Sequence, residues 1–449
     1  MRKIFSMVLF LIAALSCGAF ADIAVTVYNN DRVLVKEIRE VNLKNGVQTL
    51  EFDNVAAKII ATSVLPKFLT APDKVRVLEQ NFDYDLADAH KLLTKYIGKD
   101  IEIERAGKDK RKNISGKLLS VQGGIVVQSD EKIILSPSGE VSLPEMPEGI
   151  RLKPTLSWKI DSGYEGTEKM ELSYQTSGIS WNSDYVLVIN ESDTLADITG
   201  WVTINNKSGA IYKDAKLKLV AGDVNMVQKE KYFAANDRVY ESAAASTGGA
   251  NSFQERNFFE YHIYELQRKT TVKDNEIKQV ELLGANNVPV NKVFRYNESQ
   301  SRKVKVNLEF KNSKENNLGI PLPKGRVRVY KYDGASLEFI GEDMIAHTSK
   351  DAGISIFAGN AFDITGERTR IDYKSSPKAS EKSYKIVLKN SKPEEVEVIV
   401  VEPMYEWGNW TIMQSSAEYE KKDSATVEFK VKVPANSEAV LTYKVKLWI

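Results

Sequence analysis

The chain holds few of the side chains that enzymes use as nucleophiles, bases or metal ligands. Its 449 residues include three histidines, His90, His262 and His347, and one cysteine, Cys17. The histidines are far apart in sequence, so a catalytic triad could form only by long-range folding. A single cysteine excludes a disulfide scaffold and a cysteine-ligated zinc or iron–sulfur site. We therefore expect no cofactor and no metal, and the sequence assigns no catalytic residue.

One short segment does gather carboxylates beside an imidazole. It contains Asp83, Asp85, Asp88 and His90, and such groups can hold a divalent metal or exchange protons. The same segment leads into a stretch with helical spacing, about Asp85 to Tyr96. Carboxylates at a helix N-terminus cap its free N–H groups and interact favourably with its dipole. We therefore interpret Asp83 and Asp85 as helix caps.

Aromatic side chains offer a second kind of chemistry, because their flat faces can stack on sugar rings. The chain has six tryptophans and 19 tyrosines. Four of the tryptophans lie in strand-like patterns, so we expect them to pack in a core or on a sheet surface. They are Trp158, Trp181, Trp201 and Trp410. Tyr405 and Trp407 instead fall beside Gly408 in a predicted loop, and loops often carry binding residues. We predict Tyr405 and Trp407 as ligand-binding residues.

The composition excludes several classes of protein. Lys and Arg number 62 and Asp and Glu number 61, which gives a formal net charge of +1 at pH 7. A chain this close to neutrality has no global field to attract nucleic acid, so we expect no nucleic-acid partner. Hydrophobic residues make up 42% of the chain, which argues against disorder. The length corresponds to about three ordinary domains.

The N-terminus has the pattern of a secretory signal peptide. Arg2 and Lys3 precede the apolar run Ile4–Leu15, and small residues end at Ala21. We predict a signal peptide at residues 1–21, cleaved after Ala21, and a periplasmic or secreted protein. A lipoprotein anchored at Cys17 is the alternative. No later segment reaches about 18 consecutive apolar residues, so we expect no transmembrane span.

Alternation of apolar and polar residues with a period of two dominates the sequence. It is clearest in the segments Val304–Phe310, Val427–Val433 and Leu441–Leu447. Successive side chains of a strand point to opposite faces of a sheet, so each segment has one face for a core and one for water. Turn clusters separate these segments. The pattern predicts a mainly β protein with several antiparallel β-sandwich (Ig-like) domains.

Two segments further predict β-hairpins. Val41–Phe52 contains two strand-like runs around Asn45-Gly46, and an Asn-Gly pair in this position is a strong hairpin signal. Val431–Val445 has a similar shape, with Pro-Ala-Asn-Ser at the turn. We expect the two strands of each segment to pair with each other.

The predicted domains follow from these patterns. Residues 22–81 form an N-terminal β domain. Residues 82–143 combine the short helix with five short strands, a pattern similar to a small SH3-like or Sm-like barrel. Residues 150–449 form a long β region, with a flexible loop at 229–256 and a terminal β-sandwich at 383–449.

Several separated motifs in the C-terminal two thirds form a recognisable set. They are Glu171–Trp181, Gly200–Gly209, Tyr261–Tyr264, Gly341–Asp343 and Gly359–Asp363. On these residues, the stretch from Pro154 to Lys446 resembles the domain of unknown function 4139 (DUF4139) family and is similar to mucoidy inhibitor A proteins. A region like Val25–Leu152 accompanies the domain in bacterial exported members. The resemblance implies no particular activity, and no catalytic residue is carried over from it.

Two functions are compatible with these observations. The first is a non-enzymatic binding or structural module of the cell envelope, whose partner is an envelope protein or a glycan. The alternative is a hydrolase of envelope polysaccharide or peptide that uses paired carboxylates. That reaction requires two acidic residues facing each other across a cleft, about 5–10 Å apart. Neither hypothesis specifies an oligomeric state.

Overall fold

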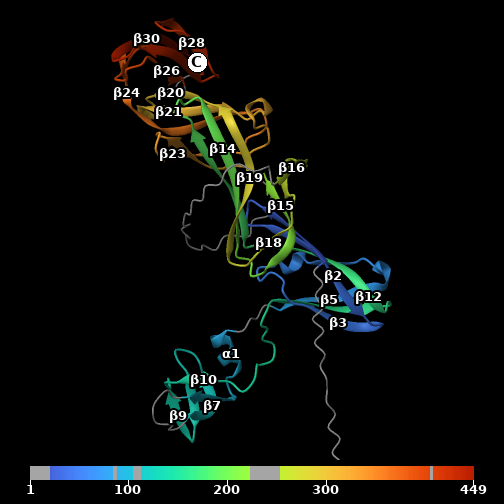
Figure 1. Cartoon of the computed structure of the whole chain (residues 1–449). Helices are drawn as coiled ribbons and strands as arrows, with labels where there is room; N and C mark the ends of the chain where they lie inside the picture. Colours follow the sequence, from blue (N-terminus) through green and yellow to red (C-terminus); the bar gives the residue numbers. More distant parts are fainter. Residues whose placement is uncertain (1–20, 84–87, 105–112, 223–252, 405–407, 449) are drawn as a thin grey trace, which may run out of the picture.

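The fold is described from a computed structural model, shown in Figure 1. The described residues are 21–83, 88–104, 113–222, 253–404 and 408–448. Strands dominate this part of the chain, and its single α-helix, α1 (Ala89–Lys95), is seven residues long. The predicted mainly β fold class is therefore confirmed. The predicted signal peptide, including Cys17, precedes β1 (Ala21–Tyr28) and lies outside the described residues apart from Ala21.

Buried apolar residues of the described chain form three clusters, which we name the central core, the C-terminal core and the small core. The central core draws residues from three sheets and from two strands of a fourth, nine-stranded sheet. The C-terminal core lies within the nine-stranded sheet, and the small core joins the C-terminal end of α1 to a separate sheet. Figure 1 shows the C-terminal sheet at one end of the molecule and the small unit set apart from the central sheets.

The eight-stranded sheet of the central core joins strands from distant parts of the sequence. In order, it contains β16 (Phe253–Phe258), β17 (Tyr261–Leu266), β15 (Tyr212–Ala221), β1, β2 (Val33–Leu43), β12 (Gly166–Thr176) and β4 (Leu65–Phe68), with β18 (Thr270–Val272) also paired to β15. β1 runs parallel to β15, and β12 pairs along the whole of β2. The N-terminal strands β1, β2 and β4 therefore share this sheet with later parts of the chain.

A three-stranded sheet packs in the same core. It contains β3 (Gly46–Phe52), β11 (Thr155–Ser162) and β5 (Val75–Asp83). β11 occupies the middle and buries Trp158, whose ring lies 4.9 Å from that of Phe52. Short 3₁₀ turns, η1 (Ala61–Ser63) and η2 (Pro72–Lys74), flank β4.

The third sheet of the central core shows the alternation expected from the sequence. It contains β19 (Glu276–Pro289), β14 (Leu195–Asn206), β13 (Ile179–Ile189), β22 (Gly325–Tyr332) and β23 (Leu337–Ile345), and η3 (Lys314–Asn316) precedes β22. Along β13, Trp181 and Leu187 are buried, while Asn182 and Asp184 lie on the opposite face. One face of this sheet therefore belongs to the core and the other to solvent.

The nine-stranded sheet folds over to enclose the C-terminal core. Its order is β27 (Asn409–Ser415), β30 (Ser437–Trp448), β25 (Ala379–Asn390), β24 (Gly353–Ser376), β21 (Ser301–Lys311), β20 (Asn291–Asn297), β26 (Val396–Pro403), β29 (Thr426–Val433) and β28 (Tyr419–Lys421). β29 and β30 are distant in this order, yet the rings of Phe429 and Tyr443 lie 4.9 Å apart. The two ends of the sheet thus face each other across the core.

Both predicted hairpins are wrong. Within the described residues, β2 and β3 belong to different sheets, and β29 and β30 pair with other neighbours. In each case the chain crosses from one layer to the facing layer, and apolar residues of both strands meet in a core, as Leu43 and Phe52 do. The local turn signal identified where the chain reverses, but burial of both apolar faces determined which strands pair.

The small unit is an open sheet rather than the predicted barrel. Its strands are β10 (Glu140–Ser142), β6 (Asp100–Glu104), β7 (Ile114–Ser120), β8 (Val126–Ser129) and β9 (Lys132–Leu135), in that order. Its edge strands, β10 and β9, have three and four residues and do not pair with each other within the described chain. Tyr96, the C-cap residue of α1, belongs to the small core, and Leu93 of the helix packs against it. One face of the sheet is therefore covered without closure.

Two further features bear on the sequence predictions. Of the loop predicted at 229–256, residues 229–252 lie outside the described chain, and 253–256 belong to β16. Among the helices that the structure describes, none combines the length and the apolar character required to cross a membrane.

Candidate functional site in the C-terminal sheet

An open cleft of about 660 Å³ lies where the nine-stranded sheet fails to close. It is lined by one continuous segment, Ile412–Tyr419. In the described chain β27 pairs with β30 and β28 with β29, so both are edge strands. These two edges are consecutive in sequence and are joined by Ser416, Ala417 and Glu418. The cleft therefore marks the opening between the two ends of the sheet.

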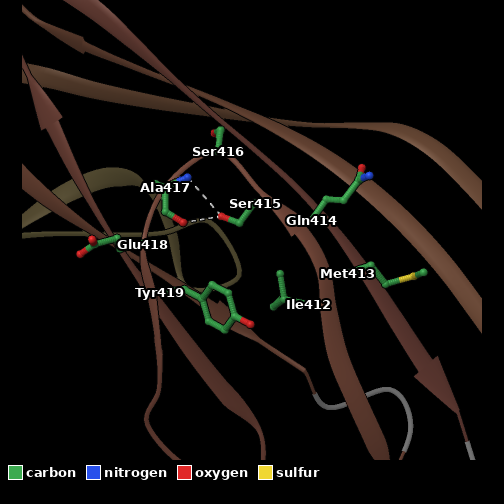
Figure 2. A pocket seen from close by; sticks show the side chains of 8 residues that line it. All are labelled: Ile412, Met413, Gln414, Ser415, Ser416, Ala417, Glu418 and Tyr419. Carbon is green, nitrogen blue, oxygen red and sulfur yellow. Dashed lines mark hydrogen bonds between the residues drawn. The ribbon is translucent and has the colours of Figure 1, made fainter.

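Figure 2 shows the groups that this cleft presents. The side chains of Ile412 and Tyr419 lie next to each other in this view. Tyr419 is 48% exposed. The Ser415 hydroxyl donates to the carbonyl of Ala417 at 2.6 Å and accepts from its N–H at 3.2 Å, which fixes the turn. Glu418 is the one carboxylate in the lining. The cleft thus combines an accessible aromatic ring with hydroxyl groups.

A row of aromatic rings leads from this cleft into the C-terminal core. The Tyr419 ring lies 5.9 Å from the ring of Phe429, and Phe429 lies 4.9 Å from Tyr443. Tyr443 in turn lies 5.3 Å from Tyr384. Beyond it, the Arg368 guanidinium sits 3.7 Å from the centre of the Tyr384 ring, within cation–π range. We call these four rings the aromatic row.

The aromatic row ends at a buried ion pair. Arg368 donates from Nε to Glu402 Oε2 at 3.0 Å, and its Nη2 forms an ion pair with the same oxygen at 2.9 Å. The Tyr443 hydroxyl donates to this oxygen at 2.6 Å. Glu402 is only 2% exposed. Burial raises the pKa of Glu402 and that of Tyr443. Two hydrogen bonds and an ion pair to one oxygen therefore compensate a carboxylate that burial would otherwise disfavour.

The predicted binding residues Tyr405 and Trp407 lie outside the described residues. The chain resumes at Gly408, immediately before β27, which lines the cleft. In β27 itself, Trp410 is buried. Its indole N–H donates to the Ser424 carbonyl at 2.6 Å, and the Lys421 ammonium lies 4.0 Å from the ring centre. Trp410 therefore packs in the sheet, as predicted.

The acidic cluster near residue 85 is dispersed. Asp85 lies outside the described residues, and Asp83 ends β5, where its carboxylate lies 3.3 Å from Arg151. The cap of α1 is Asp88, whose side chain accepts the backbone N–H of Lys91 at 2.9 Å. The capping interpretation was wrong for Asp83, because β5 continues to that residue. Among the described side chains, no three potential metal ligands gather in one place.

The three histidines lie on separate elements. His90 is in α1. His262, in β17, has its Nδ1 2.7 Å from Glu255 Oε1 on the neighbouring β16. His347 follows β23, and its Nδ1 accepts the backbone N–H of Lys324 at 3.2 Å.

Residues that carry the family resemblance hold loops together in the central core. The buried Asn206 amide donates to the carbonyls of Ala210 and Lys273 at 3.0 and 2.9 Å. Its Oδ1 accepts from both the N–H and the hydroxyl of Ser208 at 3.0 and 2.8 Å, and the Ser208 hydroxyl lies 3.0 Å from that of Tyr212. We call Asn206, Ser208 and Tyr212 the loop cluster. Their polar groups serve the fold.

A second group of these residues joins two sheets. A Cβ on Gly341 would lie 2.3 Å from the carbonyl oxygen of Ala358, so only glycine lets β23 and β24 approach this closely. Two residues on, the Asp343 carboxylate accepts the Phe357 N–H at 2.8 Å. β24 also supplies Ile356 to the central core and Ile364 to the C-terminal core. This strand therefore connects the two.

Sequence reasoning did not identify Arg368, Glu402, Tyr419 or Tyr443 as candidate residues. A signal was present for Glu402. In β26 the residues Val396, Val398 and Val400 alternate onto the buried face, and Glu402 continues that series. A charged residue at a position reserved by the period-two pattern for the core indicates a buried polar partner. The partner itself, on β24, is not local.

A comparison with known families places much of the chain in a family model. The family described as Domain of unknown function (DUF4139) matches residues 170–448, more than half of the chain. The matched residues include the five-stranded sheet of the central core, the whole nine-stranded sheet and the cleft. The small unit, 89–142, precedes them. No curated protein matches the sequence.

Proposed function

The chain belongs to the DUF4139 family, and from that premise we propose that it is an exported, non-enzymatic binding module of the cell envelope. The signal-peptide pattern at residues 1–21 supports export. The partner in this proposal is an envelope protein or a glycan, and it binds at the cleft between β27 and β28.

The cleft is the observation that carries the proposal. Its volume of about 660 Å³ lies in the range of ligand-binding sites. Its half-exposed Tyr419 offers a rigid amphipathic surface of the kind that recurs at the centres of binding interfaces. Ser416 adds a hydroxyl group, which accepts the Thr442 N–H at 2.9 Å and has a proton of its own to donate. An aromatic ring beside a hydroxyl group is the kind of surface that can bind a protein or a glycan.

The chemistry of the cleft gives no support to the hydrolase alternative. Acid–base hydrolysis of a glycosidic bond uses two carboxylates on opposite sides of the bond. The lining contains Glu418 alone, and the buried Glu402 carboxylate is engaged by Arg368 and Tyr443. Another buried glutamate, Glu168, accepts the backbone N–H groups of residues 69–71 at 2.7 to 2.9 Å. The carboxylates of Glu402 and Glu168 therefore stabilise the fold through hydrogen bonds.

An affinity experiment tests the binding site. The purified mature protein is immobilised and used to capture proteins and glycans from envelope extracts of the native host. We expect Tyr419→Ala to reduce capture at least tenfold. Tyr332→Ala, which removes a tyrosine that is exposed to a similar extent on another sheet, should leave capture unchanged. The proposal is wrong if neither kind of partner is captured, or if the two variants lose capture equally.

A second measurement tests export independently of binding. Mass spectrometry of the protein from cell fractions should show an N-terminus at Asp22 in the periplasm or medium. A lipid-modified Cys17 would support the alternative anchored form. Protein found only in the cytoplasm with its first 21 residues intact would contradict export.

A further inference from the structure

The outer edge of β27 carries backbone groups that no strand of the described chain pairs with. β27 is the first strand of the nine-stranded sheet, and in that part of the chain it pairs with β30 alone. Along an antiparallel pair, alternate residues direct their N–H and C=O groups toward the neighbouring strand, and the residues between them direct theirs away from it. About half of the backbone groups of β27 therefore point out of the sheet, where an added strand can bind them.

The side chains of β27 define what such a strand must carry. Trp410 and Ile412 lie opposite two buried residues of β30, so both face the C-terminal core. Thr411, between them, lies on the solvent-facing side. Residues opposite each other on neighbouring strands point to the same face. A strand added to β27 would therefore place apolar side chains beside Trp410 and Ile412 and a polar one beside Thr411, which describes an amphipathic extended polypeptide.

The chain covers one end of this edge and leaves the other open. At Trp410, the Lys421 ammonium of β28 lies 4.0 Å from the ring centre. At Ile412 the cleft begins, and the half-exposed Tyr419 side chain lies beside it (Figure 2). A β-bulge after Ile412 interrupts the pairing with β30, so the regular part of the edge is Asn409–Ile412. An apolar side chain of an added strand would therefore enter the cleft beside Ile412 and Tyr419.

The polar side chains of the cleft favour a glycan less than the backbone edge favours a polypeptide. The Ser415 hydroxyl donates to and accepts from the backbone of Ala417, and the Ser416 hydroxyl already accepts a backbone N–H of β30. Gln414 and Glu418 are further polar residues of the lining, but sugar hydroxyls need many groups that are free to donate or accept. An extended polypeptide instead uses backbone groups that repeat along a strand, and β27 supplies them.

We propose that the partner at the cleft is a protein, one extended segment of which adds to the free edge of β27 as a further strand. Its backbone hydrogen-bonds to Asn409–Ile412, and its apolar side chains cover Ile412 and Tyr419. This inference rests on the proposed binding function and specifies the class of partner and the way in which it binds.

Two treatments of the envelope extract distinguish a protein partner from a glycan. The full mature chain captures partners as above, after the extract has been digested with proteinase K, which is then inactivated, or after its sugars have been oxidised with periodate. Capture should be lost after proteinase K and kept after periodate. The opposite result would identify a glycan, which would overturn this inference and leave the proposed function standing. Absence of any capture would remove both.

Hydrogen exchange of the captured complex tests the backbone pairing. In the complex, exchange of the outward-pointing amides of Asn409–Ile412 should slow by about tenfold or more relative to the free chain. The control is β23, the edge strand of the five-stranded sheet, whose amides should exchange at the same rate in both samples. A captured protein that leaves exchange in Asn409–Ile412 unchanged would show recognition by side chains alone. That result would overturn strand addition without contradicting the proposed function.

Two neighbouring substitutions test which face of the added strand is apolar. Ile412→Ser removes an apolar side chain beside the cleft and should reduce capture by about tenfold. Thr411→Ser, on the opposite face of β27, should change capture by less than about twofold. Equal losses in the two variants, each shown to be folded by its unfolding transition, would contradict an amphipathic strand at this edge.

Discussion

The loop cluster and the aromatic row both contain polar groups among apolar residues. They differ in whether the chain itself supplies the hydrogen-bond partners of those groups. In the loop cluster, Asn206 makes four hydrogen bonds to its own chain, and Ser208 links it to Tyr212. In the aromatic row, one end meets the Arg368–Glu402 ion pair, and the other opens at a cleft where the edge of β27 has no strand beside it within the described chain. Polar groups saturated by the chain itself stabilise the fold, whereas groups left open can bind.

The largest effect should come from breaking the loop cluster. Asn206→Ala removes the donor to the carbonyls of Ala210 and Lys273 and the acceptor of the buried Ser208 N–H, so we expect the free energy of unfolding to fall by about 3–5 kcal/mol. Asn205→Ala, on the solvent-facing side of the same strand, should cost less than about 0.5 kcal/mol. Denaturant unfolding measures both. Hydrogen exchange should rise around residues 206–212 and stay unchanged in 396–403. Equal effects of the two variants would contradict the assignment.

The next effect concerns the ion pair. Glu402→Gln weakens the hydrogen bonds that this buried side chain accepts from Arg368 and Tyr443, and we expect a loss of about 1–3 kcal/mol at pH 7. This is less than for a fully buried pair, because Arg368 is partly exposed. Glu397→Gln, an exposed position on the same strand, is the matched control and should change stability by less than about 0.5 kcal/mol. A larger loss in Glu397→Gln would show that β26 is sensitive for another reason.

The pH dependence of that same variant gives a sign test. Burial raises the pKa of Glu402 above its ordinary value of 4.5, so the folded state holds this proton to a higher pH than the unfolded state does. The stability that protonated Glu402 contributes is complete below pH 4.5 and is lost as the pH rises through the raised pKa. The difference in unfolding free energy between parent and Glu402→Gln should therefore shrink between pH 4 and pH 7. A difference that grows over this range would mean that the ion pair lowers the pKa instead.

The smallest effect on stability should accompany the largest effect on binding. Tyr419 is half exposed and contacts one buried ring, Phe429. Tyr419→Ala should therefore lower the free energy of unfolding by less than about 1 kcal/mol while partner capture falls. Thermal and denaturant unfolding of Tyr419→Ala and Tyr332→Ala measure this. A loss of several kcal/mol in Tyr419→Ala would place this residue with the loop cluster as a structural group.

The candidate site illustrates how far local sequence can be taken. Tyr405 and Trp407 were chosen because they fall in a loop, and the described chain resumes one residue later beside the strand that lines the cleft. Glu402 was detectable as a charge in an apolar series. Its partner Arg368 was not, because the two are 34 residues apart and meet only when the sheet folds over.

The sequence alone determined that the protein is mainly β and which face of each strand is buried, because side chains alternate along an extended chain whatever its neighbours are. It did not determine which strands pair. The Asn45-Gly46 turn joins strands of different sheets, β1 runs parallel to β15, and the short strands of the small unit stay open. Pairing depends on which apolar faces can be buried together, and that involves residues far apart in sequence. The cleft exists because tertiary packing leaves β27 and β28 unpaired with each other.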